Sequence, residues 1–254
     1  MATKLLYLED FDVVECEAVV EGSGETADEN NHDGENDRME VMLNQTCFYP
    51  RGGGQDWDTG EIRSDSGVFK VEEVRLDENG VVHHFGSFVS GELKVGETAQ
   101  CKVDKERRSD NTRLHSAGHI IDMAASTLVP DWIAGRGAHY PHMSFVEYEV
   151  PEDAVADESF QTALQAKIDE LLKSDYENKT MFIDKSEMSQ YCHHVPDNIP
   201  TNKPSRIVLY ADNFGIPCGG THVKRVTEIG GVTVTKIKIK KGIAKVSYAV
   251  PGVN

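Results

Sequence analysis

Short apolar stretches separated by polar turns fill the first hundred residues of the chain. The stretches 13–20, 40–48, 68–76 and 81–88 lie between clusters of Gly, Asp, Asn and Ser. Short strands with frequent turn signals are typical of a β-barrel or a β-sandwich. The pattern therefore predicts a β domain over residues 1–104.

A helical period replaces this pattern near residue 104. Apolar residues then recur on one helix face until a proline ends the run: Leu114, Ala117, Ile121, Ala124, Ala125, Leu128 and Pro130. This spacing predicts a helix over 104–128.

The rest of the chain mixes helical and strand patterns. A second helix is predicted over 151–174, because Pro151 starts a segment with acidic first turns and an apolar stripe. Strands are predicted at 144–150, 180–184, 206–211 and 222–249. The fold class is therefore α+β, with a β domain over 1–104 and an α+β domain over 105–254.

Charge is distributed unevenly along this acidic chain. The formal net charge is −17 over 254 residues, which disfavours non-specific binding to nucleic acid. The segment 21–37 is polar, acidic and glycine-containing, and is predicted to be a solvent loop between two strands. The segment 224–245 instead holds seven basic residues against Glu228. Its Lys-Ile-Lys repeat fits either the solvated face of a strand or a phosphate-facing surface.

Membrane and disulfide signals are weak. No apolar run reaches membrane-spanning length, and the start has no secretory pattern, so we expect a soluble cytoplasmic protein without membrane partners. The five cysteines have no framework spacing, which is typical of free thiols in a reducing compartment. The oligomeric state is open, and a monomer is favoured.

Three consecutive glycines stand in the stretch YPRGGGQDWDTG at 49–60. Glycine runs occur where backbone passes close to another group, or in tight turns and bulges. The run lacks the Lys-Ser/Thr of a P-loop and the spaced glycines of a dinucleotide fingerprint. The glycines alone identify no ligand.

Two local pairs of metal-binding residues carry the strongest chemical signal. His115 and His119 lie one helical turn apart, so their imidazoles share a helix face. Cys218 and His222 have the same spacing around two glycines. Each pair alone fits ordinary polar residues, but together they form a complete tetrahedral ligand set for one Zn²⁺ per chain.

Two familiar zinc chemistries do not fit these motifs. Zincins place a glutamate directly after the first histidine, where this chain has Ser116. Zinc deaminases use His-x-Glu and Pro-Cys-x-x-Cys, where this chain has Ala117 and Thr221. No nucleophile with an adjacent base is evident.

The chain resembles the editing domain of alanyl-tRNA synthetase in three motifs: LHSAGH, CGGTH and FYPRGGGQDWDTG. The first two motifs contain the ligand pairs described above. The chain is similar over about 46–248 to the free-standing AlaX-type relatives of that domain. The resemblance implies a β-barrel-like N-terminal domain and an α/β zinc-containing editing domain. It also implies hydrolysis, in trans, of tRNA(Ala) carrying a wrong amino acid, chiefly serine.

The resemblance places zinc on the four residues His115, His119, Cys218 and His222. It sets the loop 52–55 beside the 3′ end of the tRNA, with bare backbone packing against the terminal aminoacyl-adenosine. The acidic segment 21–37 departs from the compact family pattern and should point away from the RNA.

Candidate catalytic and substrate-binding residues follow from this reading. Catalysis is assigned to His115, His119, Thr221 and Gln55. Substrate binding is assigned to Gly52, Gly53, Gly54, Gln55, Ser144 and Thr221. A hydroxyl-satisfying pocket would separate serine from alanine, and Thr221 is its first candidate, although a local cap on the turn explains this threonine equally well.

Two other functions stay open. One is a non-catalytic, zinc-stabilised tRNA-binding module. The other is a zinc hydrolase of another small ester or amide, which the basic stretch 224–245 disfavours. Because 254 residues leave little room for an aminoacylation domain beside the two domains expected here, we do not expect synthetase activity.

Overall fold

The computed structural model describes residues 1–26, 38–211 and 214–253. The described part of the chain divides into two compact units. The first comprises Met1–Gly52 and Asp56–Ser109, and the second comprises Gly53–Gln55 and Asp110–Asn254. The sequence had placed all of 52–55 in the N-terminal domain, whereas Gly53–Gln55 groups with the second unit.

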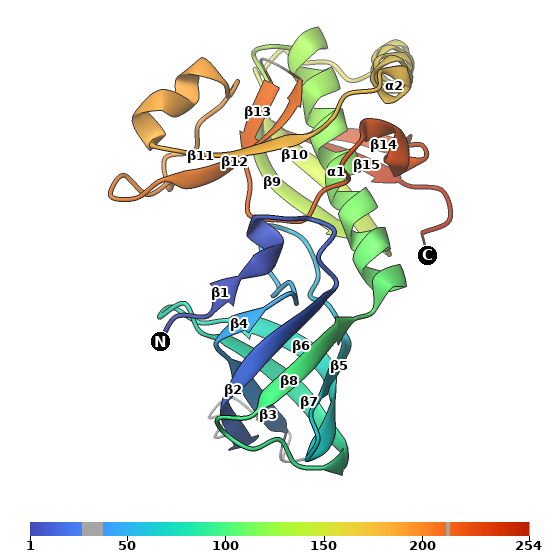
Figure 1. Cartoon of the computed structure of the whole chain (residues 1–254). Helices are drawn as coiled ribbons and strands as arrows, with labels where there is room; N and C mark the ends of the chain where they lie inside the picture. The colour runs from blue at the N-terminus through green and yellow to red at the C-terminus, as the bar shows by residue number, and fades with distance from the viewer. Residues whose placement is uncertain (27–37, 212–213, 254) are drawn as a thin grey trace. The chain divides into compact units, whose positions relative to one another are not determined.

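An antiparallel barrel forms the first unit (Figure 1). Its strands follow the order β2-β3-β7-β6-β5-β8, and β8 pairs back with β2 to close it. The bounds are β2 Glu15–Glu25, β3 Met39–Leu43, β5 Gly60–Arg63, β6 Gly67–Leu76, β7 Val82–Gly91 and β8 Thr98–Val103. Short strands β1 Lys4–Leu5 and β4 Gln45–Thr46 pair in parallel beside it. The strand pattern in the sequence fits either a barrel or a sandwich, and the structure is a closed barrel.

Alternation along the strands builds the barrel core. In β8, Ala99, Cys101 and Val103 are buried, whereas the residues between them are exposed. The same period of two puts Val41 and Leu43 of β3 into the core. Burial of these apolar side chains stabilises the unit, and the polar face stays in water.

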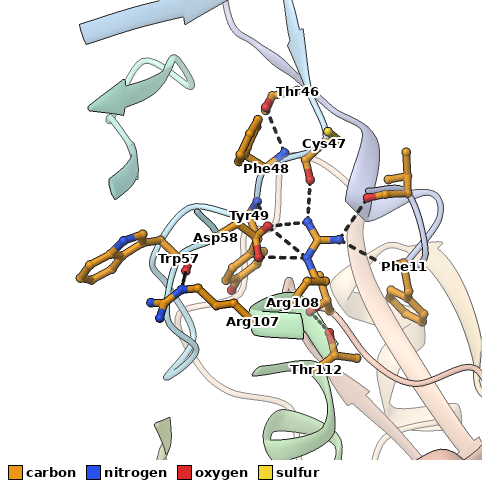
Figure 2. A network of polar contacts seen from close by, with 12 residues as sticks. Phe11, Thr46, Cys47, Phe48, Tyr49, Trp57, Asp58, Arg107, Arg108 and Thr112 are labelled. Atoms are coloured by element: carbon orange, nitrogen blue, oxygen red, sulfur yellow. Dashed lines mark hydrogen bonds and ion pairs between the residues drawn. The ribbon is translucent and has the colours of Figure 1, made fainter. Parts of the chain in front are cut away.

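One buried arginine ties several segments of the first unit together (Figure 2). Arg108, from the first turn of α1 (Lys105–Leu128), donates from Nε to both carboxylate oxygens of Asp58, at 3.1 and 3.0 Å. It also donates to the carbonyl oxygens of Cys47 at 2.6 Å and Val13 at 3.1 Å. Asp58 accepts a further bond from the Tyr49 N–H at 2.6 Å. The guanidinium thus serves a fully buried carboxylate and backbone carbonyl oxygens at the same time.

Helix α1 continues into the second unit, and its N-terminus is capped by Asp104, whose carboxylate accepts from the Glu106 and Arg107 N–H groups. Its middle is buried on nearly all sides. The buried residues include both apolar and polar side chains: Asn111, Thr112, Leu114, His115, Ser116, Ala117, His119, Ile120 and Ile121.

Two sheets and a helix complete the second unit (Figure 1). One sheet has the order β14-β15-β10-β9, and the other has the order β11-β12-β13. The bounds are β9 Ile133–Tyr140, β10 Met143–Glu149, β11 Lys179–Ile183, β12 Ser205–Ala211, β13 Phe214–Pro217, β14 Thr233–Lys240 and β15 Ile243–Ala249. Helix α2, Glu158–Lys173, packs on β14. Its Gln165 amide donates to the Val232 carbonyl oxygen just before the strand and accepts from the Val234 N–H within it. Short 3-10 helices span Leu6–Leu8 in the first unit, and Lys185–Gln190 and Val226–Ile229 in the second.

Several sequence expectations need correction. Residues 21–25 of the expected acidic loop belong to β2, and residues 27–37 lie outside the described residues. Helix α2 begins at Glu158 and not at Pro151, because the Asp157 side chain caps it by accepting from the Phe160 N–H at 2.9 Å.

The strand expected over 222–249 is also interrupted. Val226–Ile229 forms a 3-10 helix, and Gly230 ends it at a φ of 77°. The sequence missed β9, since its two glycines break the alternation that identifies a strand. In the part of the chain that the structure describes, no helix has the length and apolar character needed to cross a membrane.

Candidate metal centre

Two histidines of α1 form the first half of the site. His115 and His119 follow each other on one helix face, with ring centroids 5.0 Å apart. Both side chains are buried, because α1 is covered at this point. Helical periodicity alone therefore explains why this local pair could be predicted from the sequence.

The loop after β13 supplies the second half. Arg206 of β12 holds this loop by donating from Nε to the Cys218 carbonyl oxygen at 2.8 Å and from Nη2 to the Gly220 carbonyl oxygen. The Cys218 N–H in turn donates to the Arg206 carbonyl oxygen at 3.1 Å. The loop is thereby fixed with Cys218 and His222 directed toward His115.

The ligand atoms of His115, His119, Cys218 and His222 all lie within 4.8 Å of one another. Cys218 Sγ is 3.4 Å from His115 Nε2 and 3.3 Å from His222 Nε2. Tetrahedral zinc with ordinary Zn–S and Zn–N bonds would hold such atoms about 3.6 Å apart. The structure thus brings together the four residues that the sequence singled out, and the cluster can hold a metal ion.

Outer hydrogen bonds set the orientation of His115. The Thr221 N–H donates to Gln55 Oε1 at 3.0 Å, which identifies that atom as the amide oxygen. His115 Nδ1 lies 2.7 Å from the same oxygen, so it must carry a proton and donate. Nε2 is then left with its lone pair facing Cys218. Such an outer-shell partner fixes the tautomer that a metal requires.

His222 is oriented by Tyr210, and His119 has an unsatisfied nitrogen. The Tyr210 hydroxyl lies 2.7 Å from His222 Nδ1, on the opposite side of the ring from Cys218. His119 Nδ1 is buried and has no hydrogen-bond partner among the described residues. A buried imidazole nitrogen without a hydrogen-bond partner inside a His/Cys cluster fits the role of a metal ligand.

Burial also sets the charge state of the cluster. It lowers the pKa of His115, His119 and His222 well below the usual value, and neighbouring imidazoles and Arg206 lower these pKa values further. The histidines are therefore neutral, which is the form that binds metals. Burial raises the pKa of the Cys218 thiol, and Arg206 and the Gly220 N–H oppose that rise.

Gln55 and Thr221 are fully buried at the base of the cluster. Gln55 Nε2 donates to Thr221 Oγ1 at 2.8 Å, and Thr221 Oγ1 lies 2.7 Å from Thr112 Oγ1. These contacts connect the Gln55 segment, the 218–222 loop and α1. Both residues position His115, and a direct role in catalysis or substrate binding stays a prediction.

The glycine run approaches the protein's own backbone. The Gly54 carbonyl oxygen accepts from the His139 N–H at 2.8 Å, and Gly54 has a φ of +78°. A Cβ at Gly54 would lie 2.5 Å from the Gly137 carbonyl oxygen of β9. This close approach explains the glycine at 54, and an RNA-facing role for Gly52, Gly53 and Gly54 stays a prediction.

Ser144 has a local partner. Its hydroxyl donates to the Tyr140 carbonyl oxygen at 2.8 Å, across the turn between β9 and β10. Its assigned contact with substrate stays a prediction.

The sequence missed three residues around the cluster. His139 stacks on His115 with ring centroids 4.6 Å apart, and its Nδ1 lies 2.6 Å from the Tyr248 hydroxyl. Burial lowers the pKa of His139 to about 4, so this ring is neutral. Arg206 and Tyr210 come from β12. No motif marks them, because only the fold brings β9 and β12 to the cluster.

Removing the space at Gly220 should damage the centre. A Cβ there would lie 2.2 Å from His115 Cε1 and 2.3 Å from Nδ1. We therefore expect Gly220→Ala to displace His115, weaken metal binding by about 10- to 100-fold and destabilise the fold by about 1–3 kcal/mol. Competition with a chelating dye measures the first effect, and thermal unfolding measures the second.

Gly219→Ala is the matched control, because a Cβ at Gly219 meets no atom within 4 Å. Equal zinc affinity in the two variants would contradict the role assigned to Gly220.

The chain is similar in sequence to aminoacyl-tRNA synthetases. Residues 2–107 match the family described as tRNA synthetases class II (A). The alanine–tRNA ligase of Nitrosopumilus maritimus is 30% identical over 82% of this chain and 23% of its own length. The alanine–tRNA ligase of Streptomyces avermitilis is 29% identical over 85% of this chain and 24% of its own length. The chain therefore spans about a quarter of the length of these curated relatives.

Proposed function

The chain is related to the alanyl-tRNA synthetases, as its motifs had indicated, and we propose that it is a zinc-dependent aminoacyl-tRNA deacylase. It removes a wrong amino acid, chiefly serine, from tRNA(Ala) in trans, in the cytoplasm where tRNA is charged. The observation that carries the proposal is the convergence of His115, His119, Cys218 and His222 in a chain related to alanine–tRNA ligases.

The reaction is hydrolysis of the ester that joins the amino acid to the terminal ribose. Water oxygen bonds to the ester carbonyl carbon, the bond to the ribose oxygen breaks, and one water proton passes to that oxygen, which leaves as the ribose hydroxyl while the amino acid leaves as the acid. A bound Zn²⁺ would supply polarisation of the carbonyl or of water. The protein supplies a fixed frame: Gln55 orients His115, Tyr210 orients His222, and Arg206 holds the cysteine loop.

Specificity for serine requires a partner for its hydroxyl. Thr221 and Gln55 are the first candidates, and Ser144 is the next. The Thr221 and Gln55 side chains are fully buried, so the Gln55–Thr221–Thr112 contacts would have to open before either could offer the substrate hydroxyl a hydrogen bond that alanine cannot use. A site built this way discriminates strongly between the two substrates.

A second candidate function is a zinc-stabilised tRNA-binding module without catalysis. It is favoured by the four protein ligands, because structural zinc sites are closed and catalytic ones usually keep an open position.

Deacylation of Ser-tRNA(Ala) and Ala-tRNA(Ala) by protein of known zinc content tests the proposal. We expect fast loss of serine with alanine spared. Tight tRNA binding without hydrolysis of either ester would favour the binding module. Hydrolysis of simple amino-acid esters, with no tRNA binding, would favour a hydrolase of other small esters.

A lysine face on the second unit is suited to RNA phosphates. We use this name for Lys236, Lys238 and Lys240 of β14 together with Lys245 of β15. Lys238 pairs directly with Lys245 across the two strands. None of these lysines forms an ion pair with a described carboxylate, although the protein carries a net charge of −17. Like charges directly opposite each other are unfavourable, and a polyanion would offset this repulsion, although Glu147 of β10 also lies opposite Lys245.

Removing the lysine face should weaken tRNA binding. We expect a triple variant with Lys236→Thr, Lys238→Thr and Lys240→Thr to reduce the slope of log affinity against log salt by about one per lysine. Each lost phosphate contact leaves counterions unreleased. Filter binding of uncharged tRNA(Ala) over a salt series measures this slope.

The control is a triple variant with threonine in place of Lys70, Lys94 and Lys102, which are exposed in the barrel unit. It makes the same change in net charge. An equal loss of slope in both triple variants would show that only overall charge matters, and would contradict a specific lysine face.

A further inference from the structure

A cavity of about 170 Å³ lies against the metal cluster within the second unit. His119 and His139 line it on the cluster side, and Asp122, His193, His194 and Pro217 line other parts of it. An apolar cavity of about 150 Å³ is known to hold benzene, which has six non-hydrogen atoms. This cavity therefore has room for a group of about that size. An alanyl or seryl group has five or six non-hydrogen atoms.

Asp122 brings a carboxyl group into this cavity from the same face of α1 as the histidines. It follows His119 by three residues and His115 by seven, which is the spacing of one helix face. The side chain is half-buried, and it forms no ion pair with a described lysine or arginine. Its nearby polar neighbour is Tyr148, and burial raises the pKa of Asp122 to about 7.

The charge in this part of the cavity is one-sided. Among the described residues that line the cavity, Asp122 is the only carboxylate, and no lysine or arginine lines it. A half-buried carboxylate without a lysine or arginine partner favours a cationic ligand, since the pair would offset the cost of desolvating the carboxylate. A hard metal ion fits poorly, because it needs several oxygen ligands and Asp122 offers one carboxylate.

We propose that Asp122 binds the α-ammonium group of the aminoacyl ester, and that the cavity admits only small aminoacyl groups. This inference rests on the proposed deacylase function and adds a substrate-binding residue to it. The ammonium group is the cation common to all aminoacyl-tRNAs. Its pairing with Asp122 places the acyl group beside His119, and the cavity volume then limits the length of the side chain.

N-acetylation of the substrate removes the ammonium charge and tests this pairing directly. For the wild-type protein, we expect kcat/KM for N-acetyl-Ser-tRNA(Ala) to fall about 10- to 100-fold below that for Ser-tRNA(Ala). For Asp122→Asn, we expect kcat/KM for Ser-tRNA(Ala) to fall by a similar factor, with little change for the acetylated substrate. The preference for the free amino group should therefore disappear in the variant, an effect that a merely structural role would not produce.

Asp131→Asn is the matched control, because Asp131 is exposed in the loop after α1. It should keep the wild-type preference, and all three proteins should contain equal zinc. A preserved preference for the free amino group in Asp122→Asn would overturn the inference.

Binding of small amides separates failure of this inference from failure of the proposed function. Calorimetry with L-alaninamide and N-acetyl-L-alaninamide needs no hydrolysis and no tRNA. We expect wild-type protein to bind only L-alaninamide, and Asp122→Asn to lose this binding. Absent or equal binding of the two amides to wild-type protein would overturn the inference, even if Ser-tRNA(Ala) is deacylated. Selective binding by a protein that deacylates neither tRNA would support the ammonium site and reject the deacylase.

Discussion

Replacing His119 with alanine should remove zinc from the protein and abolish deacylation of Ser-tRNA(Ala). His119 is one of four residues whose ligand atoms lie within 4.8 Å of one another, and its ring is buried among the other two histidines. Loss of an outer-shell partner costs roughly 10- to 100-fold in metal affinity or activity, and loss of a ligand should cost more. Metal analysis after dialysis and single-turnover deacylation measure the two effects.

His142→Ala controls for the removal of a histidine. His142 is exposed in the turn between β9 and β10, and its ring lies near Tyr140 rather than in the cluster. It should keep stoichiometric zinc and wild-type activity. If His119→Ala also keeps both, the assignment of the metal centre is wrong.

Replacing Arg108 with methionine should strongly destabilise the barrel unit. The substitution leaves the Asp58 carboxylate and the Cys47 carbonyl oxygen buried without the guanidinium. Removing one member of a buried ion pair costs about 3–5 kcal/mol. For a protein of this size, that corresponds to a fall in melting temperature of about 10 °C. Thermal and urea unfolding measure it.

The neighbouring Arg107 provides a control of the same residue type (Figure 2). It is half-buried, lies over the Trp57 ring and donates to the Trp57 carbonyl oxygen at 2.8 Å. Arg107→Met should cost only about 1 kcal/mol. In addition, Asp58→Leu combined with Arg108→Met should recover part of the loss, because no buried charge then remains. Equal costs for the two single variants would contradict the role given to Arg108.

Local periodicity explains which parts of the fold could be predicted. The spacing in α1 identified a helix within one residue of its observed start, because its apolar residues recur over several turns. The sequence predicts the start of α2 too early, because a proline such as Pro151 is typical of a helix start. The observed start is instead set by the Asp157 side chain, which caps the helix. The glycines of β9 hid a strand whose pairing with β10 is visible only in the fold.

Closure of the barrel depends on contacts that no local pattern contains. Cys16 of β2 pairs with Cys101 of β8, and this long-range register separates a barrel from a sandwich. Strand alternation identified β structure but could not choose between the two architectures.

The metal cluster could be predicted because each half is a local pair. His115 with His119 and Cys218 with His222 keep their spacing in the sequence, so only their meeting had to be inferred. Asp122, His139 and Arg206 belong to no such motif. Their roles follow from buried contacts between α1, β9 and β12, which depend on tertiary structure.

The most direct test of the account is single-turnover deacylation of Ser-tRNA(Ala) and Ala-tRNA(Ala) by wild-type protein and Cys218→Ala, with zinc measured in each sample. Cys16→Ala, which removes a half-buried thiol of the barrel unit, is the control. We expect wild-type protein and Cys16→Ala to release serine rapidly and spare alanine, and Cys218→Ala to lose both zinc and activity. Undiminished deacylation by zinc-free Cys218→Ala, or no deacylation by zinc-loaded wild-type protein, would contradict this expectation.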